Sequence, residues 1–179
     1  METEIEKIII SEADIKDRVR ELAERIVADY ERKELTMIGI LNGGLIFLAD
    51  LIRHIPFAVK IDTVRVNTYM GDATYPKREA DIVDNIRLNV TDEHVRVVDD
   101  ILDTGKTLLK TLEIIKKRNP LSVKVCVLLN KRERREREIN PDYCCFDVEN
   151  RFVVGYGLDY DNRYRNLPYI AVLREKYHT

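Results

Sequence analysis

The sequence of 179 residues has no tryptophan, only three cysteines, and few glycines and prolines (7 and 5). An odd number of cysteines, two of them adjacent at Cys144 and Cys145, does not fit a secreted disulfide framework, so a reducing cytoplasm is expected. Scarce Gly and Pro together with 45% hydrophobic residues exclude collagen-like and low-complexity chains. The length predicts one compact domain.

The chain also lacks an excess of one charge and a long apolar run. Its 30 basic and 32 acidic residues give a formal net charge of −2, which provides no global field for a nucleic acid or a membrane surface. No stretch approaches the roughly 18 apolar residues of a membrane span, and the acidic first residues do not resemble a signal peptide. We therefore expect neither nucleic acid nor membrane as a partner, and any polyanion must be recognised locally.

Helical and strand-like patterns alternate along the chain. Apolar residues at three- and four-residue spacing predict helices, and short apolar β-branched runs predict strands. Strands are expected at 36–41, 57–69, 95–98 and 122–129, and helices at 11–33, 45–55 and 104–118. This alternation predicts an α/β domain with a central, mostly parallel sheet flanked by helices. The polar stretch from Met70 to Asp84 suits a lid or binding loop, and the tail from Arg151 to Leu173 suits short strands and turns.

The string VRVVDDILDTGKTL, residues 95–108, carries the chemistry. In a parallel α/β sheet, ligands collect beyond the carboxyl ends of strands, where backbone amides of a helix N-terminus bind phosphate. Asp99 and Asp100 would repel that phosphate unless they face sugar hydroxyls or Mg²⁺. The string therefore predicts a phosphorylated sugar as ligand, although Asp-Thr-Gly alone often serves only as a turn and helix cap.

This string resembles the phosphoribosyl pyrophosphate motif of type I phosphoribosyltransferases: an apolar run, two acids, two apolar residues and then Asp-Thr-Gly-x-Thr. The tail RFVVGYGLDYDNRYRNLPYIAVL is similar to the purine-binding end of the hypoxanthine-guanine phosphoribosyltransferases. GILNGGLIFLADLI and VNTYMGD resemble that family's pyrophosphate loop and mobile loop, in the same order. The resemblance implies the type I phosphoribosyltransferase fold as a single domain over 1–179. Its expected parts are a core at about 11–150, a small hood from the chain termini at 1–10 and 151–179, and a mobile loop at about 67–85.

The resemblance also implies roles for individual residues. Asp103 matches the general base near purine N7, and Asp99 and Asp100 match the acidic pair that binds ribose hydroxyls and Mg²⁺. Asp159 is expected near a second Mg²⁺. The 5′-phosphate is expected at Asp103, Thr104, Gly105, Lys106 and Thr107; pyrophosphate at Leu41, Asn42, Gly43, Gly44 and Arg165; the purine at Lys131, Phe152, Val153 and Asp159; and the closing loop at Thr68 and Tyr69.

One departure from the family pattern lies in the pyrophosphate loop. Asn42 stands where the family usually has Lys or Arg, in a loop where a non-proline cis peptide is typical. Loss of this cation is expected to weaken pyrophosphate binding or subunit contacts. The charged run from Arg132 to Glu138, in contrast, is expected to be solvated surface.

The function implied by the resemblance is purine salvage. A magnesium-dependent enzyme would join hypoxanthine or guanine to phosphoribosyl pyrophosphate, giving IMP or GMP and pyrophosphate, and would assemble as a homodimer or homotetramer. Lys131 donates to an oxygen acceptor, which disfavours adenine. The alternatives are a xanthine-preferring transferase and a nucleotide-sensing, RNA-binding regulator on the same fold.

Overall fold

The computed structural model describes residues 3–30, 34–67, 81–84 and 86–177. The helices are α1 (Glu12–Tyr30), α2 (Gly44–Arg53), α3 (Lys106–Lys116) and the short 3₁₀ helix η1 (Glu175–Tyr177). The strands are β1 (Ile5–Ile10), β2 (Leu35–Leu41), β3 (Lys60–Asn67), β4 (Asp81–Asp84), β5 (His94–Leu102), β6 (Ser122–Asn130), β7 (Tyr143–Asp147), β8 (Val153–Val154) and β9 (Ile170–Leu173).

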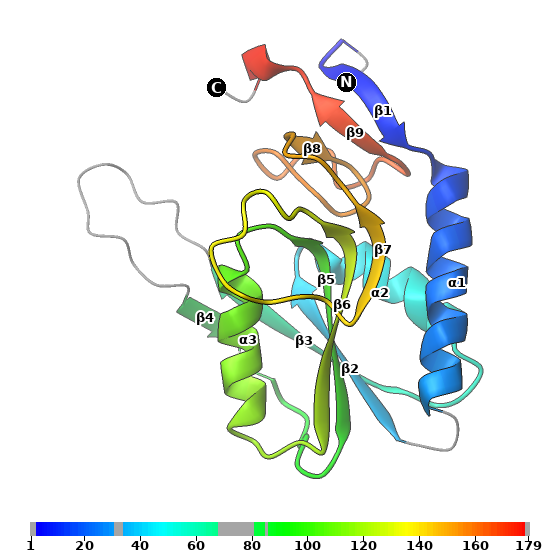
Figure 1. The fold of residues 1–179 in the computed structure, drawn as a ribbon, viewed down its shortest axis with the longest axis vertical. Coiled ribbons are helices and arrows are strands. Elements are labelled where there is room, and N and C mark those ends of the chain that lie inside the picture. Colours follow the sequence, from blue (N-terminus) through cyan, green and yellow to red (C-terminus); the bar gives the residue numbers. More distant parts are fainter. Residues whose placement is uncertain (1–2, 31–33, 68–80, 85, 178–179) are drawn as a thin grey trace.

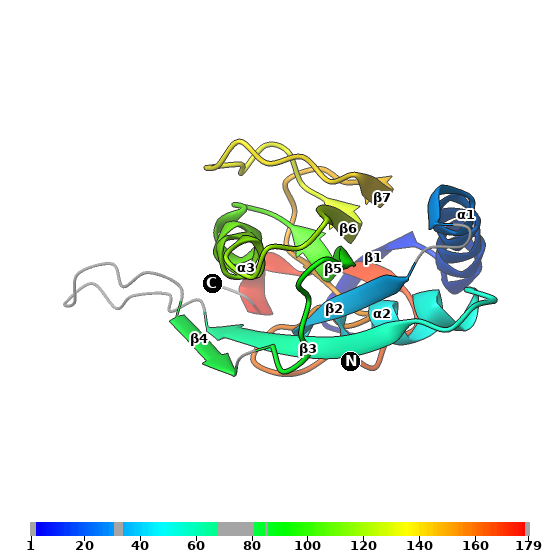
Figure 2. The same ribbon diagram turned by 90° about the horizontal axis from the view of Figure 1, so that it is seen from below.

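The main sheet has the order β4-β3-β2-β5-β6-β7 (Figure 1). Five of its strands, β3, β2, β5, β6 and β7, run parallel, and β4 pairs antiparallel with β3 at one edge. Helices α1 and α2 cover one face and α3 covers the other (Figure 2). The predicted α/β architecture with a mostly parallel sheet between helices is therefore confirmed.

The two ends of the chain meet in a second, three-stranded sheet of order β1-β9-β8. Its strands are antiparallel, with β9 between the N-terminal strand and β8. In Figure 1 this sheet lies beyond the carboxyl ends of the main parallel strands, which is the edge where a ligand is expected. The tail between β8 and β9 therefore extends over that edge.

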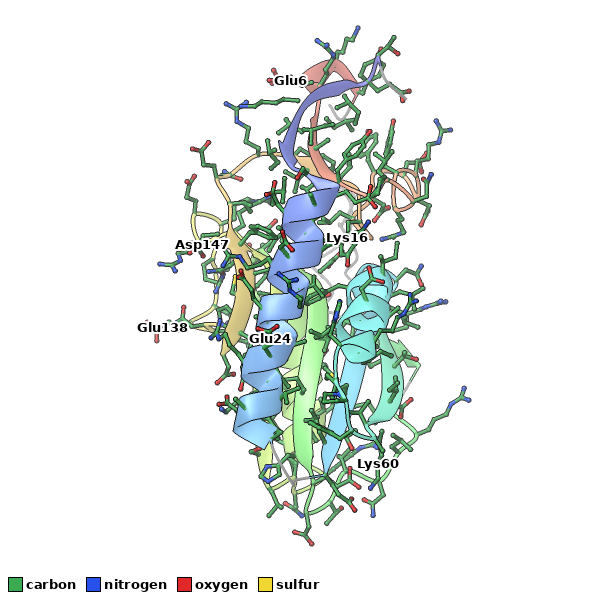
Figure 3. The ribbon with its side chains drawn as sticks, turned by 90° about the vertical axis from the view of Figure 1, so that its right-hand side faces the viewer. Glu6, Lys16, Glu24, Lys60, Glu138 and Asp147 are labelled. Atoms are coloured by element: carbon green, nitrogen blue, oxygen red, sulfur yellow. The ribbon has the colours of Figure 1, made fainter. Side chains whose placement is uncertain are left out.

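Helix α1 forms as its sequence pattern predicts. The backbone amide of Asp14 donates to Ser11 Oγ at 3.1 Å, so Ser11 caps the helix. The apolar stripe is buried, while charged side chains such as Lys16 and Glu24 project from the opposite face (Figure 3). Tertiary burial of this stripe, more than helix propensity, stabilises a helix of this kind.

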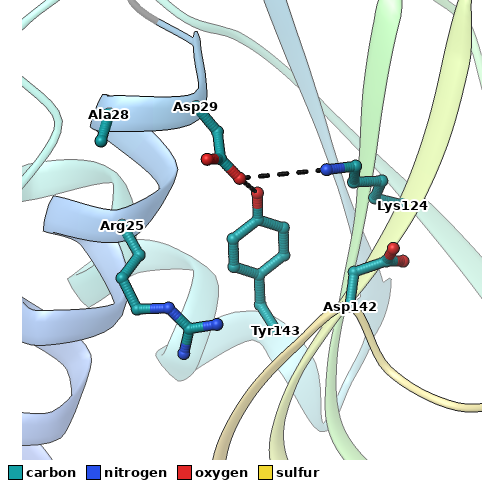
Figure 4. Close-up of a pocket in the computed structure, with 6 residues that line it drawn as sticks. All are labelled: Arg25, Ala28, Asp29, Lys124, Asp142 and Tyr143. Carbon is teal, nitrogen blue, oxygen red and sulfur yellow. Dashed lines mark hydrogen bonds and ion pairs between the residues drawn. The ribbon is translucent and has the colours of Figure 1, made fainter.

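The central strand β5 is buried from Val95 to Asp100, because both faces of the parallel sheet are covered. Arg96 interrupts the apolar run before Asp99: the side chain is fully buried, and its guanidinium carbon lies 4.4 Å and 4.5 Å from the ring centres of Tyr30 and Tyr143. The Tyr143 hydroxyl donates to Asp29, whose carboxylate also lies 3.9 Å from Lys124 Nζ (Figure 4). The cation of Arg96 is thus held between two aromatic rings, and its Nη2 also donates to the Tyr143 hydroxyl at 3.4 Å.

Several element boundaries differ from the sequence prediction: α2 ends at Arg53 instead of position 55, β5 continues to Leu102 instead of 98, and α3 ends at Lys116 instead of 118. Helix α3 begins at Lys106 instead of position 104, because Gly105 adopts a left-handed conformation with φ of 86°. Strand β3 begins at Lys60 instead of position 57. Thr68, Tyr69 and most of the segment predicted as a mobile loop lie outside the described residues.

Candidate active site

Two carboxylates are buried at the carboxyl end of β5. The Asp100 amide donates to Asp99 Oδ1 at 3.0 Å, and the Ile101 amide donates to Asp100 Oδ1 at 2.8 Å. Burial raises the pKa of both groups, and the neighbouring Asp100 raises that of Asp99 further. Gly43 packs so closely on the Asp100 carboxylate that any Cβ there would collide with it. The acidic pair and the loop after β2 therefore form one site.

The segment from Asp103 to Thr107 connects the end of β5 to the first turn of α3. The N-cap residue of α3, Gly105, makes no side-chain cap, and among the described residues only the Lys106 amide donates to a side chain near the start of the helix, to Thr104 Oγ1 at 3.5 Å. The other amides of the first turn can donate to an anion. The Lys106 ammonium pairs with Glu136 Oε2 at 2.6 Å. The segment predicted to bind the 5′-phosphate thus forms a strand-turn-helix.

Asp103 and Lys131 meet from different strands. Lys131, 4% exposed, follows β6, donates to the Arg151 carbonyl at 2.9 Å and lies 3.9 Å from Asp103 Oδ2. Burial lowers the pKa of Lys131, and the charge of Asp103 partly opposes that effect. Asp103 Oδ1 is buried and has no hydrogen-bond partner among the described residues. An orphaned buried acceptor is costly, so this atom fits a donor supplied by a ligand.

Arg151 connects Lys131 to the part of the tail predicted to bind the purine. Phe152 follows it and is 36% exposed, with its ring edge-on to Tyr160 at 5.5 Å between centres. Val153 is buried in β8. The structure thus brings a lysine donor and an exposed aromatic ring into neighbouring positions.

The predicted pyrophosphate residues also come together. The peptide between Leu41 and Asn42 is cis, and Arg65 Nη2 donates to Asn42 Oδ1 at 3.2 Å. Arg165 Nη1 donates to the Gly157 carbonyl at 2.6 Å, and its Nη2 lies 2.7 Å from Asp159 Oδ1. Gly157 itself lies against the Gly43 carbonyl, where a Cβ would collide. Asp159 is thus held by an arginine beside the loop.

Sequence reasoning missed the contribution of the charged run after Lys131. Arg134 Nη1 lies 3.3 Å from Asp103 Oδ2, and Arg135 hydrogen-bonds the backbone of the phosphate loop. The remaining residues from Arg132 to Glu138 are exposed as predicted. The alternating charges carried no signal that distinguished Arg135 from its neighbours.

Two further properties bear on ligands. Within the part of the chain that the structure describes, no three His, Cys, Asp or Glu side chains are arranged to hold a metal ion. Over the same residues, no helix has the length and apolar character needed to cross a membrane.

Comparison with known proteins agrees with this geometry. A model of the phosphoribosyl transferase domain family matches residues 9–161. The hypoxanthine-guanine phosphoribosyltransferases of Streptococcus thermophilus and Streptococcus pneumoniae are each 40% identical over 176 residues, which cover 98% of this chain and 97% of theirs. Among solved structures, a hypoxanthine phosphoribosyltransferase from Staphylococcus aureus has a TM-score of 0.94 at 35% identity and covers 100% of this chain and 97% of its own. A hypoxanthine-guanine phosphoribosyltransferase from Bacillus anthracis has a TM-score of 0.88 at 37% identity, with 96% and 99% covered. The chain therefore belongs to the phosphoribosyl transferase domain family and, within it, to the hypoxanthine-guanine phosphoribosyltransferases.

Proposed function

We propose that this enzyme transfers the 5-phosphoribosyl group from phosphoribosyl pyrophosphate to hypoxanthine or guanine, giving IMP or GMP and pyrophosphate, as a step of purine salvage. The observation that carries the proposal is the contact between Asp103 and Lys131, which combines a buried carboxylate oxygen lacking a donor with a buried ammonium. A 6-oxopurine offers the matching groups, an N–H at N7 and an oxygen at C6.

Asp103 accepts the N7 proton in this proposal, while Lys131 orients the base through its 6-oxo group. Phe152 stacks on the purine, and the Val153 carbonyl and the Asp159 region face its 2-position. Asp99 and Asp100 accept hydrogen bonds from the ribose hydroxyls. Loop Asp103–Thr107 binds the 5′-phosphate, and the Leu41–Gly44 loop with Arg165 binds pyrophosphate.

Mg²⁺ is the cofactor that we propose for this site. The fit rests on the donor set: Asp99 and Asp100 are adjacent carboxylates at the end of β5, and burial raises the pKa of both. Mg²⁺ commonly uses one or two carboxylates together with substrate oxygens, so a full protein cage is not required. Asp159 is proposed as a further ligand. Neutralisation of charge on the departing pyrophosphate is the chemistry that the ion supplies when bound.

Substitution at the anomeric carbon develops positive charge on the ribose ring, so the enzyme's contribution is to position the two substrates and to exclude water. In this proposal the buried carboxylates Asp99 and Asp100 stabilise that charge. Closure by Thr68 and Tyr69 remains a prediction from the sequence, as do a cytoplasmic location and assembly into a homodimer or homotetramer.

The test is product formation from phosphoribosyl pyrophosphate and Mg²⁺ with hypoxanthine, guanine, xanthine and adenine offered separately. Turnover of hypoxanthine or guanine with little adenine is the expected result. Preference for xanthine would move the assignment to a xanthine transferase. Nucleotide binding without turnover of any base would favour the sensing role, which a salt-sensitive RNA gel shift would then test.

A further inference from the structure

Arg135 differs from every neighbour in the charged run after β6. Between Arg132 and Glu138 it alone is partly buried. This segment, extended to Ile139 and called here the backing segment, crosses in front of α3 before the chain enters β7 (Figure 1). A buried guanidinium requires several acceptors, and the identity of those acceptors indicates its role.

Four acceptors surround the Arg135 guanidinium. Nε donates to the Asp103 carbonyl at 3.0 Å, and Nη2 donates to the Leu102 carbonyl at 3.2 Å and to Asn130 Oδ1 at 2.6 Å. Nη1 donates to the Ile139 carbonyl. One side chain thus connects the ends of β5 and β6 with the end of the backing segment.

The backing segment makes further contacts with the phosphate loop. The Glu136 amide donates to the Thr104 carbonyl at 3.1 Å. A Cβ at Gly105 would lie 2.9 Å from Ile139 Cγ2, so the loop packs directly on the segment. The carbonyls of three successive residues, Leu102, Asp103 and Thr104, therefore all accept hydrogen bonds from the backing segment, and that of Leu102 also accepts from the Lys131 amide at 3.0 Å.

The planar trans peptide converts this arrangement into an anion site. The N–H of each peptide unit points away from its C=O, so holding these three carbonyls turns the amides of Asp103, Thr104 and Gly105 to the opposite side. Among the described residues, none of these three amides has a protein acceptor. Successive amides that converge in this way form a cradle for phosphate oxygens.

We propose that Arg135 is a positioning residue for the phosphoribosyl substrate: by fastening the carbonyls of Leu102 and Asp103, it aims the loop amides at the 5′-phosphate. This inference rests on the proposed function. The guanidinium contacts the rear of the loop and does not touch the reacting atoms. The side chains proposed to bind the purine, Lys131 and Phe152, lie outside this loop, so the effect of Arg135 on binding should be larger for the phosphorylated substrate than for the purine.

The test compares Arg135→Gln and Arg135→Lys with Arg137→Gln, a matched control that removes the same charge from an exposed position of the same segment. For each folded protein we would measure KM for phosphoribosyl pyrophosphate, KM for hypoxanthine, Tm, and the calorimetric Kd for phosphoribosyl pyrophosphate. Arg135→Gln is expected to raise KM and Kd for phosphoribosyl pyrophosphate on the order of ten- to a hundredfold, because misplaced binding groups lose that much. KM for hypoxanthine should change less than about threefold, since its contacts remain.

Arg135→Lys keeps the charge but loses the planar fork, so it should also weaken phosphoribosyl pyrophosphate, whereas Arg137→Gln should match the wild type. Equal changes in both KM values, or none, in folded Arg135→Gln would overturn the inference in favour of a purely structural role. If Arg135→Gln does not fold, the same comparison of the two KM values in Arg135→Lys decides. Failure of the wild type to turn over any purine would reject the proposed function. The ratio of the Kd for phosphoribosyl pyrophosphate of Arg135→Gln to that of the wild type would still test the role of Arg135.

Discussion

The Lys131 ammonium lies 3.9 Å from Asp103 Oδ2, and the two residues reach this contact from the ends of neighbouring parallel strands, β6 and β5. Burial lowers the pKa of Lys131, and the charge of Asp103 partly opposes that shift. The second Asp103 oxygen, Oδ1, is left without a donor among the described residues. A base and a hydrogen-bond donor are therefore preorganised side by side.

Asp103→Asn should separate chemistry from binding. The amide keeps the size and shape of the side chain but cannot accept the N7 proton. We expect kcat to fall by on the order of 10²–10⁴ while KM for hypoxanthine changes little, the loss typical of a general base. Steady-state kinetics measure both constants, and an unchanged kcat would remove the assignment of Asp103 as base.

Lys131 should set the alkaline side of the pH profile. Because burial lowers its pKa, the ammonium loses its proton at a lower pH than an exposed lysine, and kcat/KM for hypoxanthine should fall there. Stability changes in the opposite direction: below the folded pKa of Lys131 the buried ammonium lowers the free energy of unfolding, and this penalty is lost as pH rises from the folded pKa to the ordinary value. Arginine stays protonated over this range, so in Lys131→Arg the alkaline fall of kcat/KM should move to higher pH. Ionisation of the purine affects the wild type and Lys131→Arg equally. Identical pH profiles of kcat/KM for the two enzymes would therefore exclude Lys131 as the hydrogen-bond donor to the purine.

Local pattern predicted the fold and the placement of the acidic pair, but not the contacts that depend on tertiary packing. The β-branched run before Asp99 and the periodic residues after Gly105 suffice for a strand-turn-helix. The α3 boundary was missed by two residues because the left-handed Gly105 delays the helix. The sequence did not indicate that Arg96 is buried or that Arg135 is partly buried, since their burial depends on two tyrosine rings and on backbone carbonyls from other elements. Charge in a sequence indicates exposure on average, and only the fold identifies the exceptions.

Asn42→Lys should strengthen pyrophosphate binding. The Leu41–Gly44 loop carries no cation of its own, and the nearby Arg65 is exposed and donates to the Asn42 amide oxygen at 3.2 Å. A lysine ammonium close to the anion should contribute about 1 kcal/mol, so the apparent constant for pyrophosphate in the reverse reaction should fall roughly fivefold. Ala49→Lys, on the exposed face of α2, adds the same charge elsewhere and serves as control. Equal constants for the wild type and Asn42→Lys would contradict the prediction.

The cysteines should be inert in the native enzyme. Burial raises the pKa of Cys144 to about 11 and that of Cys145 to about 12, and it raises that of Cys126 well above the ordinary value. At pH 8 the thiolate fraction of even Cys144 is on the order of 10⁻³, and thiolate is the reactive form. Iodoacetamide at pH 8 should therefore label all three only after denaturation, as mass spectrometry would measure. Rapid labelling of the folded protein would show that one thiol is ionised or accessible.

Gly157→Ala should affect both stability and the pyrophosphate end of the site. Gly157 has φ of 102°, and a Cβ there would collide with the Gly43 carbonyl, a backbone atom that cannot turn aside. The strain should lower the free energy of unfolding by roughly 1–3 kcal/mol. The collision should also push the Leu41–Gly44 loop away from Asp100, so KM for phosphoribosyl pyrophosphate should rise as well. The control is Gly39→Ala in β2, where the Cβ would meet the flexible end of Leu48 at 2.6 Å. It should lower Tm in a thermal melt but leave that KM unchanged, so a rise in both variants would mean that the KM effect follows stability alone.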